Sequence, residues 1–302
     1  MNNRKKSFRS WLLCTSGIAR FCFCMALIVF SLSWSGVAIG GEDLILGVQP
    51  YLSKEKLIHS FVPLAEYLGK KIDRTIRLGI AKNYNEHIER VGNDEYDIAF
   101  MGPAPYVKLT TEYGPKTTPL ARFEIQGKPY FQGKIIIPKN STLKELRDLK
   151  GKRFAFGDPE STMSHLVPHY MLIEAGVHVE DLAHFDFVGS HDDVVQRVLA
   201  GDYDAGAVQD QVFYELEPWG LRELATTPQI SEHLFVASNK LDPETISKLR
   251  TALYELKDSE QGRQIMQGIK VTLTAMVPVQ DSDYDNLRAI IHKMAETGLS
   301  PP

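Results

Sequence analysis

A run of hydroxyl side chains after a tight turn forms the segment of this sequence with the most specific chemistry. The apolar strand that ends at Phe156 is followed by Gly-Asp-Pro, and a helix is expected to begin at Ser161 or Thr162. The first N–H groups of a helix have no partner within it and carry the positive end of its dipole, so they can bind an anion. Ser164 adds a hydroxyl donor and His165 a possible proton donor. This pattern predicts a small oxyanion site, although a serine or threonine can also simply cap a helix.

Two more polar side chains follow predicted strands later in the chain. His191 comes after the strand 185–188, and Asp210 comes after the strand 203–208. In open α/β sheets the carboxyl ends of the strands face the ligand crevice. We therefore expect both side chains at the binding site. The alternative is that His191 only begins a helix and that Asp210 only caps the next one.

Tyrosines follow two predicted strands in the first half of the chain. Tyr51 ends the segment GVQPY, and Tyr106 ends the segment GPAPY, which comes directly after the strand 96–101. A phenol can donate a hydrogen bond to an oxyanion, and its ring can pack over an apolar substituent. Both tyrosines are therefore expected to contribute to the same anion site.

The elements that carry these residues alternate between strand and helix. Apolar strand-like runs alternate with amphipathic helix patterns over residues 44–112 and again over residues 144–208. Such alternation is typical of α/β folds with largely parallel sheets. Strand-like crossovers near residues 127–133 and 225–231 would join two lobes, and ligands bind at interfaces of this kind. The sequence therefore predicts a two-lobed α/β fold with a ligand cleft and a two-strand hinge.

The order of the elements also predicts domain boundaries. Residues 41–130 are expected to form the first part of lobe 1, and residues 131–228 are expected to form lobe 2. Residues 229–302 would return to lobe 1 and end in helices. No short internal repeat or low-complexity linker interrupts this order.

The first 40 residues have the layout of a secretory signal peptide. Four basic residues among the first nine precede an apolar run over residues 21–37, and cleavage is expected just before Ile39 or Gly41. The alternative is an uncleaved membrane anchor, because an apolar run of this length is borderline for a bilayer span. We expect cleavage and a periplasmic product.

Composition excludes several classes of site and partner. All three cysteines lie within the predicted signal, so the mature chain would have no thiol for a disulfide, a nucleophile or a cysteine metal site. A net charge of −4 and a pI near 6.2 provide no basic field for nucleic acid or for an anionic membrane surface. Any anion site must therefore be local.

The chain resembles the phosphate-, phosphite- and phosphonate-binding proteins of ABC transporters. Three segments carry the resemblance: GDPESTMSHLVPHYML (157–172), GSHDDVVQRVLAGDYDAGAVQD (189–210) and DIAFMGPAPYV (97–107). The similarity covers about residues 44–276 and implies a type II periplasmic-binding fold. It also implies a ligand site of eight residues, in which Ser161, Thr162, Ser164 and His165 hold the oxygens and Tyr51, Tyr106, His191 and Asp210 close the pocket.

Two positions depart from the family pattern. Met163 places an apolar side chain inside the hydroxyl run, which leaves the size of the pocket open. His191 stands where aminoalkylphosphonate binders of the family place an acidic residue to pair with the ligand's ammonium. A histidine there favours a small ligand without an amine, such as phosphite, phosphate or methylphosphonate. The resemblance also implies a monomer without a cofactor that delivers its ligand to an ABC permease.

Other classes of function use some of the same residue types. A transferrin-like protein of this fold could bind Fe(III) through tyrosine, histidine and carboxylate side chains, but neutral hydroxyls are poor partners for a trivalent cation. A hydrolase would need Ser164 and His165 to face each other, which adjacent helix residues do not do. The chain also has no G-x-S-x-G elbow. A sensing module without a transport role stays open at this level.

Overall fold

The computed structural model describes residues 43–296. The predicted signal peptide, residues 1–40, lies outside the described residues. Within the described part of the chain, no helix is both long and apolar enough to cross a membrane.

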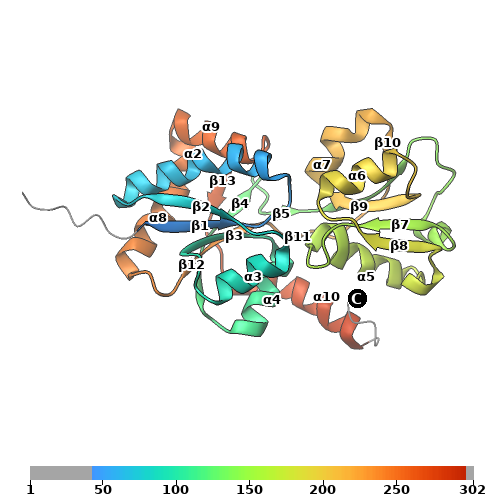
Figure 1. Cartoon of the computed structure of the whole chain (residues 1–302), viewed down its shortest axis with the longest axis horizontal. Helices are drawn as coiled ribbons and strands as arrows, with labels where there is room; N and C mark the ends of the chain where they lie inside the picture. The colour runs from blue at the N-terminus through green and yellow to red at the C-terminus, as the bar shows by residue number, and fades with distance from the viewer. Residues whose placement is uncertain (1–42, 297–302) are drawn as a thin grey trace, which may run out of the picture. The chain divides into compact units, whose positions relative to one another are not determined.

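Two β-sheets form the framework of the protein (Figure 1). The strands of the first sheet are β1 (Leu44–Val48), β2 (Ile76–Ile80), β3 (Ile98–Met101), β4 (Thr117–Glu124), β12 (Leu234–Ser238) and β13 (Ala275–Val277). The strands of the second sheet are β6 (Gly133–Pro138), β7 (Arg153–Phe156), β8 (His184–Phe187), β9 (Ala205–Gln209) and β10 (Leu221–Thr226).

The two sheets have corresponding strand orders. The first sheet has the order β13-β4-β12-β3-β1-β2, and the second has the order β10-β6-β9-β7-β8. In each sheet, three neighbouring strands are parallel. A strand that enters from the other sheet pairs antiparallel with the outer one of these three. These strands are β12 in the first sheet and β6 in the second. The predicted two-lobed α/β fold is confirmed, with antiparallel strands completing each parallel core.

The hinge consists of two crossing segments. The short strands β5 (Tyr130–Phe131) and β11 (Ile230–Ser231) pair antiparallel with each other between the two sheets. Thr227 connects the same two segments, because its side-chain oxygen accepts a hydrogen bond from the Gly133 N–H at 2.7 Å. Its backbone N–H also donates to the Gly133 carbonyl at 3.0 Å. The crossovers lie where the sequence predicted them.

Helices cover both faces of each sheet (Figure 1). The helices of the first lobe are α2 (Lys54–Ile72), α3 (Tyr84–Gly92), α4 (Pro103–Tyr113), α8 (Pro243–Glu255), α9 (Glu260–Ile269) and α10 (Asp285–Glu296). The helices of the second lobe are α5 (Val167–Glu174), α6 (His191–Leu199) and α7 (Asp210–Leu216). Several begin with a side-chain cap, such as Ser53 before α2 and Ser190 before α6, which satisfies an N–H that the helix itself leaves unpaired.

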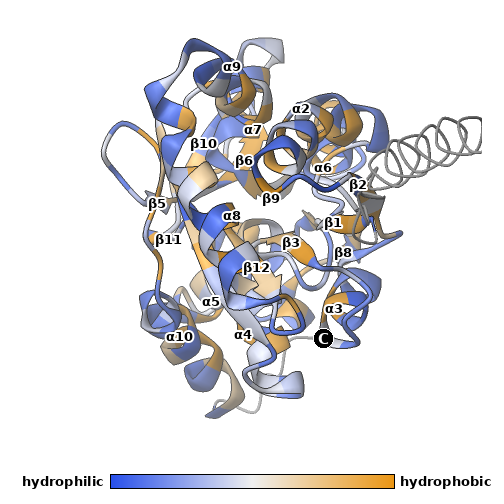
Figure 2. Cartoon of the chain, turned by 90° about the vertical axis from the view of Figure 1, so that its left-hand side faces the viewer, coloured by the Kyte–Doolittle hydropathy of each residue, from blue (hydrophilic) through white to orange (hydrophobic). Residues whose placement is uncertain are grey.

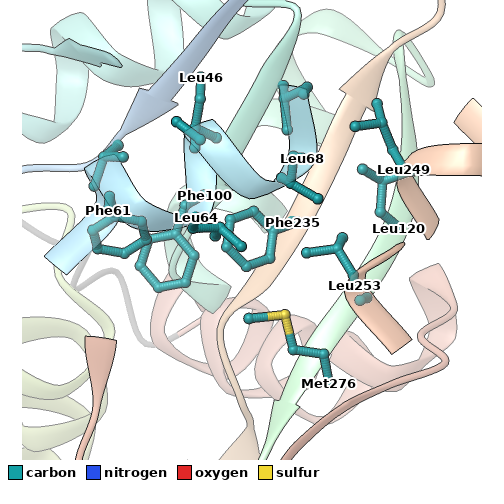
Figure 3. Packing of buried hydrophobic residues seen from close by; sticks show 14 of the residues in the cluster. Leu46, Phe61, Leu64, Leu68, Phe100, Leu120, Phe235, Leu249, Leu253 and Met276 are labelled. Carbon is teal, nitrogen blue, oxygen red and sulfur yellow. The ribbon is translucent and has the colours of Figure 1, made fainter. Parts of the chain in front are cut away.

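The first-lobe core forms where α2 packs on the sheet. Phe61, Leu64 and Leu68 recur at helical spacing on α2 and are fully buried against Phe100 of β3 and Phe235 of β12 (Figure 3). The rings of Phe100 and Phe235 have centroids 5.1 Å apart. Figure 2 shows the same division, with hydrophobic residues along β1 and β3 and hydrophilic residues over much of α2 and α8. This core fixes the strand ends from which the first-lobe site residues project.

Phe235→Ala should lower the free energy of unfolding by about 3–5 kcal/mol, because it removes a fully buried ring and leaves a cavity. Urea unfolding followed by circular dichroism measures the change. Val62→Ala, on the exposed side of α2, is the matched control and should change stability by less than about 0.5 kcal/mol. Equal effects of the two substitutions would contradict this account of the core.

Candidate functional site

The predicted anion-binding segment begins where β7 ends. Ser161 is the N-cap of the helix start, and its side-chain oxygen accepts a hydrogen bond from the Ser164 N–H at 3.2 Å. The Ser161 carbonyl accepts a second bond from the Leu166 N–H at 3.0 Å. Because this bond joins residues five apart, Thr162–Leu166 form a π-helical turn, which leads into α5. Such turns occur frequently at functional sites, and their first N–H groups have no partner within the turn.

Ser164 packs against the end of β7. A Cβ on Gly157 would clash with Ser164 Oγ, so only glycine allows this close approach. The Gly157 N–H also donates to the Ser164 carbonyl at 3.0 Å. Ser164 therefore joins the helix start to its own sheet. That its hydroxyl also holds ligand oxygens stays a prediction.

The His165 ring is fully buried in the second lobe. Its Nδ1–H donates to the Pro159 carbonyl at 2.5 Å, and its centroid lies 5.1 Å from Phe156, 4.8 Å from Phe187 and 5.4 Å from His169. Burial lowers the pKa of His165 to about 3, although the bond to Pro159 opposes the shift, so the ring is neutral at pH 7. The ring packs within its own lobe, and its buried Nε2 has no hydrogen-bond partner among the described residues. That this ring contacts the ligand stays a prediction.

Thr162 connects the helix start to the first lobe. Its side-chain oxygen accepts a hydrogen bond from the Ala104 N–H, in the first turn of α4, at 2.9 Å. The N-cap Gly102 provides no side-chain cap, and Pro103 and Pro105 carry no N–H. Ala104 therefore supplies the backbone donor among residues 103–105 of α4, and Thr162 is its acceptor. Two helix N-termini face each other here, an arrangement that favours an anion.

The N-terminus of α3 lies at the same place. The Tyr84 N–H lies 3.4 Å from Oδ2 of Asp158, in the turn after β7. The Tyr84 side chain is buried and hydrogen-bonds with Ser161. Burial, and to a smaller extent the charge of Asp158, raises the pKa of the Tyr84 phenol, which therefore stays protonated. Neither Tyr84 nor Asp158 was predicted as a site residue. The available signal was that Tyr84 follows β2 much as Tyr51 follows β1.

His191 and Asp210 follow β8 and β9, at the strand ends that the sequence indicated. His191 Nδ1 accepts a hydrogen bond from the Gln209 N–H at 3.2 Å, which places the ring proton on Nε2. Burial, with a smaller effect of the nearby His233, lowers the pKa of His191 to about 3. Burial raises the pKa of Asp210, whereas Lys270, whose Nζ lies 3.9 Å from Asp210 Oδ1, opposes that shift. The two side chains offer a neutral donor and an acceptor.

The two predicted tyrosines have different surroundings. Tyr51 is buried with its ring 5.9 Å from that of Phe100 and 6.0 Å from that of His233, between centroids. Burial, with the charge of Glu232, raises the pKa of Tyr51. In contrast, the Tyr106 hydroxyl donates to Asp281 Oδ1 at 2.9 Å. Tyr51 therefore lies beside the hinge residues, whereas the Tyr106 hydroxyl is engaged by the C-terminal part of the first lobe.

A buried ion cluster adjoins Tyr51 and Asp210. Glu232 is 0% exposed, and its Oε1 lies 2.9 Å from Lys270 Nζ. Its Oε2 accepts hydrogen bonds from the backbone N–H and from Nδ1 of His233, both at 2.9 Å. Burial alone would raise the pKa of Glu232, but Lys270 and then His233 outweigh it and lower the pKa to about 2. Nothing in the sequence pattern pointed to this cluster, because its carboxylate and ammonium are 38 residues apart.

Met163 contacts the hinge. Its Sδ lies 3.5 Å from Thr227 Oγ1, and a Cβ on Gly133 would lie 3.0 Å from the Met163 Cβ. The side chain packs in the same cluster as Phe131 and Ile230, on the two hinge strands. The apolar residue inside the hydroxyl run therefore joins the helix start to the hinge.

The candidate residues form a continuous series of neighbours. At one end, Ser161 and Thr162 meet Tyr84 and Ala104. The series continues through Tyr51, whose ring centroid lies 6.0 Å from that of His233 beside the hinge. Its other end consists of His191, His233, Glu232, Lys270 and Asp210. Among residues 43–296, no group of three or more His, Cys, Asp or Glu side chains is arranged to hold a metal ion.

Comparison with known proteins identifies the family. Residues 46–284 match the family model described as the periplasmic substrate-binding protein of phosphonate ABC transporters. The chain belongs to this family. The resemblance seen in the three sequence segments is thereby confirmed, and no comparison supports the Fe(III)-binding alternative.

Similar proteins include two relatives named for phosphorus oxyanions. The chain is 29% identical to the phosphate-import protein PhnD of Mycolicibacterium smegmatis, over 90% of this chain and 94% of that protein. It is 28% identical to a probable phosphite-binding protein, PhnD1, of Prochlorococcus marinus, over 62% of this chain and 64% of that protein. The solved structure of PhnD1 from Prochlorococcus marinus in complex with methylphosphonate matches with a TM-score of 0.77 at 23% identity, over 84% of this chain and 98% of that one. The type II periplasmic-binding fold is thus confirmed.

The buried histidine behind the helix start predicts a specific acid sensitivity. An unfolded chain protonates this ring below its ordinary pKa of 6.5, whereas the folded ring stays neutral down to about pH 3. The unfolded state therefore binds more protons in this range, and stability falls as the pH falls, by up to about 1.4 kcal/mol per pH unit for this ring. His165→Asn keeps a donor for the Pro159 carbonyl but cannot titrate.

We expect the unfolding free energy of His165→Asn to fall less steeply than that of the parent between pH 6.5 and 3. Denaturant unfolding at several pH values measures both slopes. The comparison uses the difference in slope, so a constant loss of stability in the variant does not affect it. Identical slopes would show that His165 is not held neutral in the folded protein.

Proposed function

We propose that this chain is an exported periplasmic protein that binds a small phosphorus oxyanion or phosphonate between its lobes and delivers it to an ABC importer. Phosphite, phosphate and methylphosphonate are the ligands that fit best. We further propose that the protein acts as a monomer, catalyses no reaction, binds no nucleic acid and requires no cofactor. Relatives named for phosphate import and phosphite binding support this choice of ligands.

The contact that carries the proposal is the hydrogen bond from the Ala104 N–H to Thr162 Oγ1 across the lobes. It brings the N-termini of two helices to one point. A tetrahedral oxyanion at this point would accept hydrogen bonds from both lobes, and binding would therefore favour closure. Neutral donors also allow an anion to bind without a fixed cation beside it.

We assign roles within the proposed site according to these contacts. Ser161 and Thr162, with the backbone N–H groups of the π-helical turn, bind the oxygens. Tyr51 and His191 Nε2–H donate from the two sides of the cleft, and Asp210 accepts from a protonated ligand oxygen. The predicted ligand contacts of Ser164, His165 and Tyr106 stay part of the proposal. His165 also supports the turn through Pro159, and Tyr106 also orients α4 through Asp281.

The energetics of this donor set are sufficient for capture. A micromolar dissociation constant corresponds to about −8 kcal/mol. Hydrogen bonds to a charged group contribute roughly 1.5–3 kcal/mol each, so a handful of donors reaches this value. These hydrogen bonds alone can therefore account for micromolar binding.

Thr162→Ala should weaken binding of methylphosphonate, phosphite and phosphate by about ten- to a hundredfold, because it removes one hydrogen bond to a charged ligand. It also removes the acceptor for Ala104. Isothermal titration calorimetry measures the affinities. Thr162→Ser keeps the hydroxyl and is the matched control, with an affinity close to that of the parent. If Thr162→Ala binds all three ligands as tightly as the parent, the proposed cradle is in the wrong place.

The mature protein should begin near Ile39 or Gly41 and be recovered from the periplasm, because basic residues, an apolar run and small residues precede that point. Mass spectrometry of the protein released by osmotic shock identifies its first residue. A protein that keeps Met1 and stays in the membrane fraction would support the uncleaved anchor instead.

A further inference from the structure

The ammonium of Lys270 lies between two carboxylates that belong to different parts of the fold. Its Nζ is 2.9 Å from Glu232 Oε1, at the hinge, and 3.9 Å from Asp210 Oδ1, in the second lobe. The Lys270 side chain is 7% exposed and that of Glu232 is 0% exposed. A buried ammonium and a buried carboxylate are tolerated only when they are paired, so each of these groups depends on the other.

This ammonium also borders a cavity that residues of both lobes line. The cavity has a volume of about 360 Å³ and is lined by Asp210, Tyr214, Glu215, Lys270 and Val271, among others. Asp210 belongs both to this cavity and to the proposed ligand site. The head group of Lys270 therefore lies beside the carboxylate that this cavity shares with the proposed ligand site.

We propose that Lys270 is a specificity-determining residue that excludes phosphonates carrying an amine, because its ammonium already occupies the position between Asp210 and Glu232. This inference rests on the proposed function of the chain. Without Lys270, the two carboxylates would form a buried acidic pair that requires a cation. The ammonium of an aminoalkylphosphonate could meet that requirement, whereas methylphosphonate could not.

With Lys270 present, an aminoalkylphosphonate is at a disadvantage. Its ammonium would lose its water and lie close to another ammonium, while Glu232 is already paired with Lys270. A ligand without an amine has no such cost. Lys270 would thus take the place of the ligand's ammonium and select against a ligand that carries one. Any effect of His191 would add to this selection.

The experiment compares methylphosphonate with 2-aminoethylphosphonate by isothermal titration calorimetry. The parent should bind methylphosphonate more tightly. Lys270→Ala should shift the ratio of the two affinities toward 2-aminoethylphosphonate by about tenfold or more, the size expected for a charge-assisted hydrogen bond that only one of the two ligands can make. A parent that prefers 2-aminoethylphosphonate would overturn the proposal.

Two further variants make the result decisive. Lys270→Gln removes the charge but keeps a donor for Glu232 and most of the side-chain volume, so it serves if Lys270→Ala does not fold, and it should shift the ratio in the same direction. Lys71→Ala removes a lysine from the exposed pair with Glu255 and should leave the ratio unchanged. Circular dichroism confirms that each variant is folded.

A second readout does not depend on a phosphonate. Methylammonium chloride should raise the melting temperature of Lys270→Ala, because the small cation can take the vacated position, whereas sodium chloride at the same concentration should not. The inference fails if the folded Lys270 variants keep the parent's ratio of affinities for methylphosphonate and 2-aminoethylphosphonate and if methylammonium does not stabilise them. The proposed function would then still stand. A parent that binds no phosphonate, phosphite or phosphate would overturn the proposed function and this inference together.

Discussion

The N–H groups at buried helix starts need acceptors, and the interface between the lobes is organised around this need. The helices α3, α4 and the π-helical turn before α5 all begin at this interface. Within the described chain, Asp158 and Thr162 provide the acceptors for Tyr84 and Ala104. A buried donor without an acceptor costs about 1–3 kcal/mol, so the contacts that close the lobes also satisfy these groups. Closure therefore satisfies donors at the same helix starts that the proposed anion would face.

The helix start is held in place from behind. Gly157 allows Ser164 to approach the end of β7, and His165 fixes the preceding turn through the Pro159 carbonyl. Met163 contacts Thr227, which itself ties the two hinge segments together. Residues that surround the proposed ligand position are thus rigidly attached to the second sheet and to the hinge. Rotation at the hinge would carry the whole cradle as one body toward α3 and α4.

At the other end of the cleft, the charges of buried side chains compensate one another. Asp210 and Glu232 would repel an anion if both were uncompensated, and burial would make the repulsion strong. Lys270 supplies a positive charge to both, and His233 adds two hydrogen bonds to Glu232. The donors that face the proposed anion are neutral, whereas the fixed charges compensate one another. This separation reconciles an anion site with a net charge of −4.

The alternating elements, the two crossovers and the helix start at Ser161 were predictable from local sequence, because each depends on a local pattern or on a cap within a few residues. The sequence also indicated that His191 and Asp210 follow strands. The surroundings of each side chain at the helix start depend on long-range packing. Ser164 and His165 pack against their own sheet, while Thr162 contacts α4. The π-helical turn rotates these side chains from the positions that a regular helix would give them. The pair of Glu232 and Lys270 was equally inaccessible, because contacts between residues far apart in sequence arise from packing of whole elements, which no local pattern encodes.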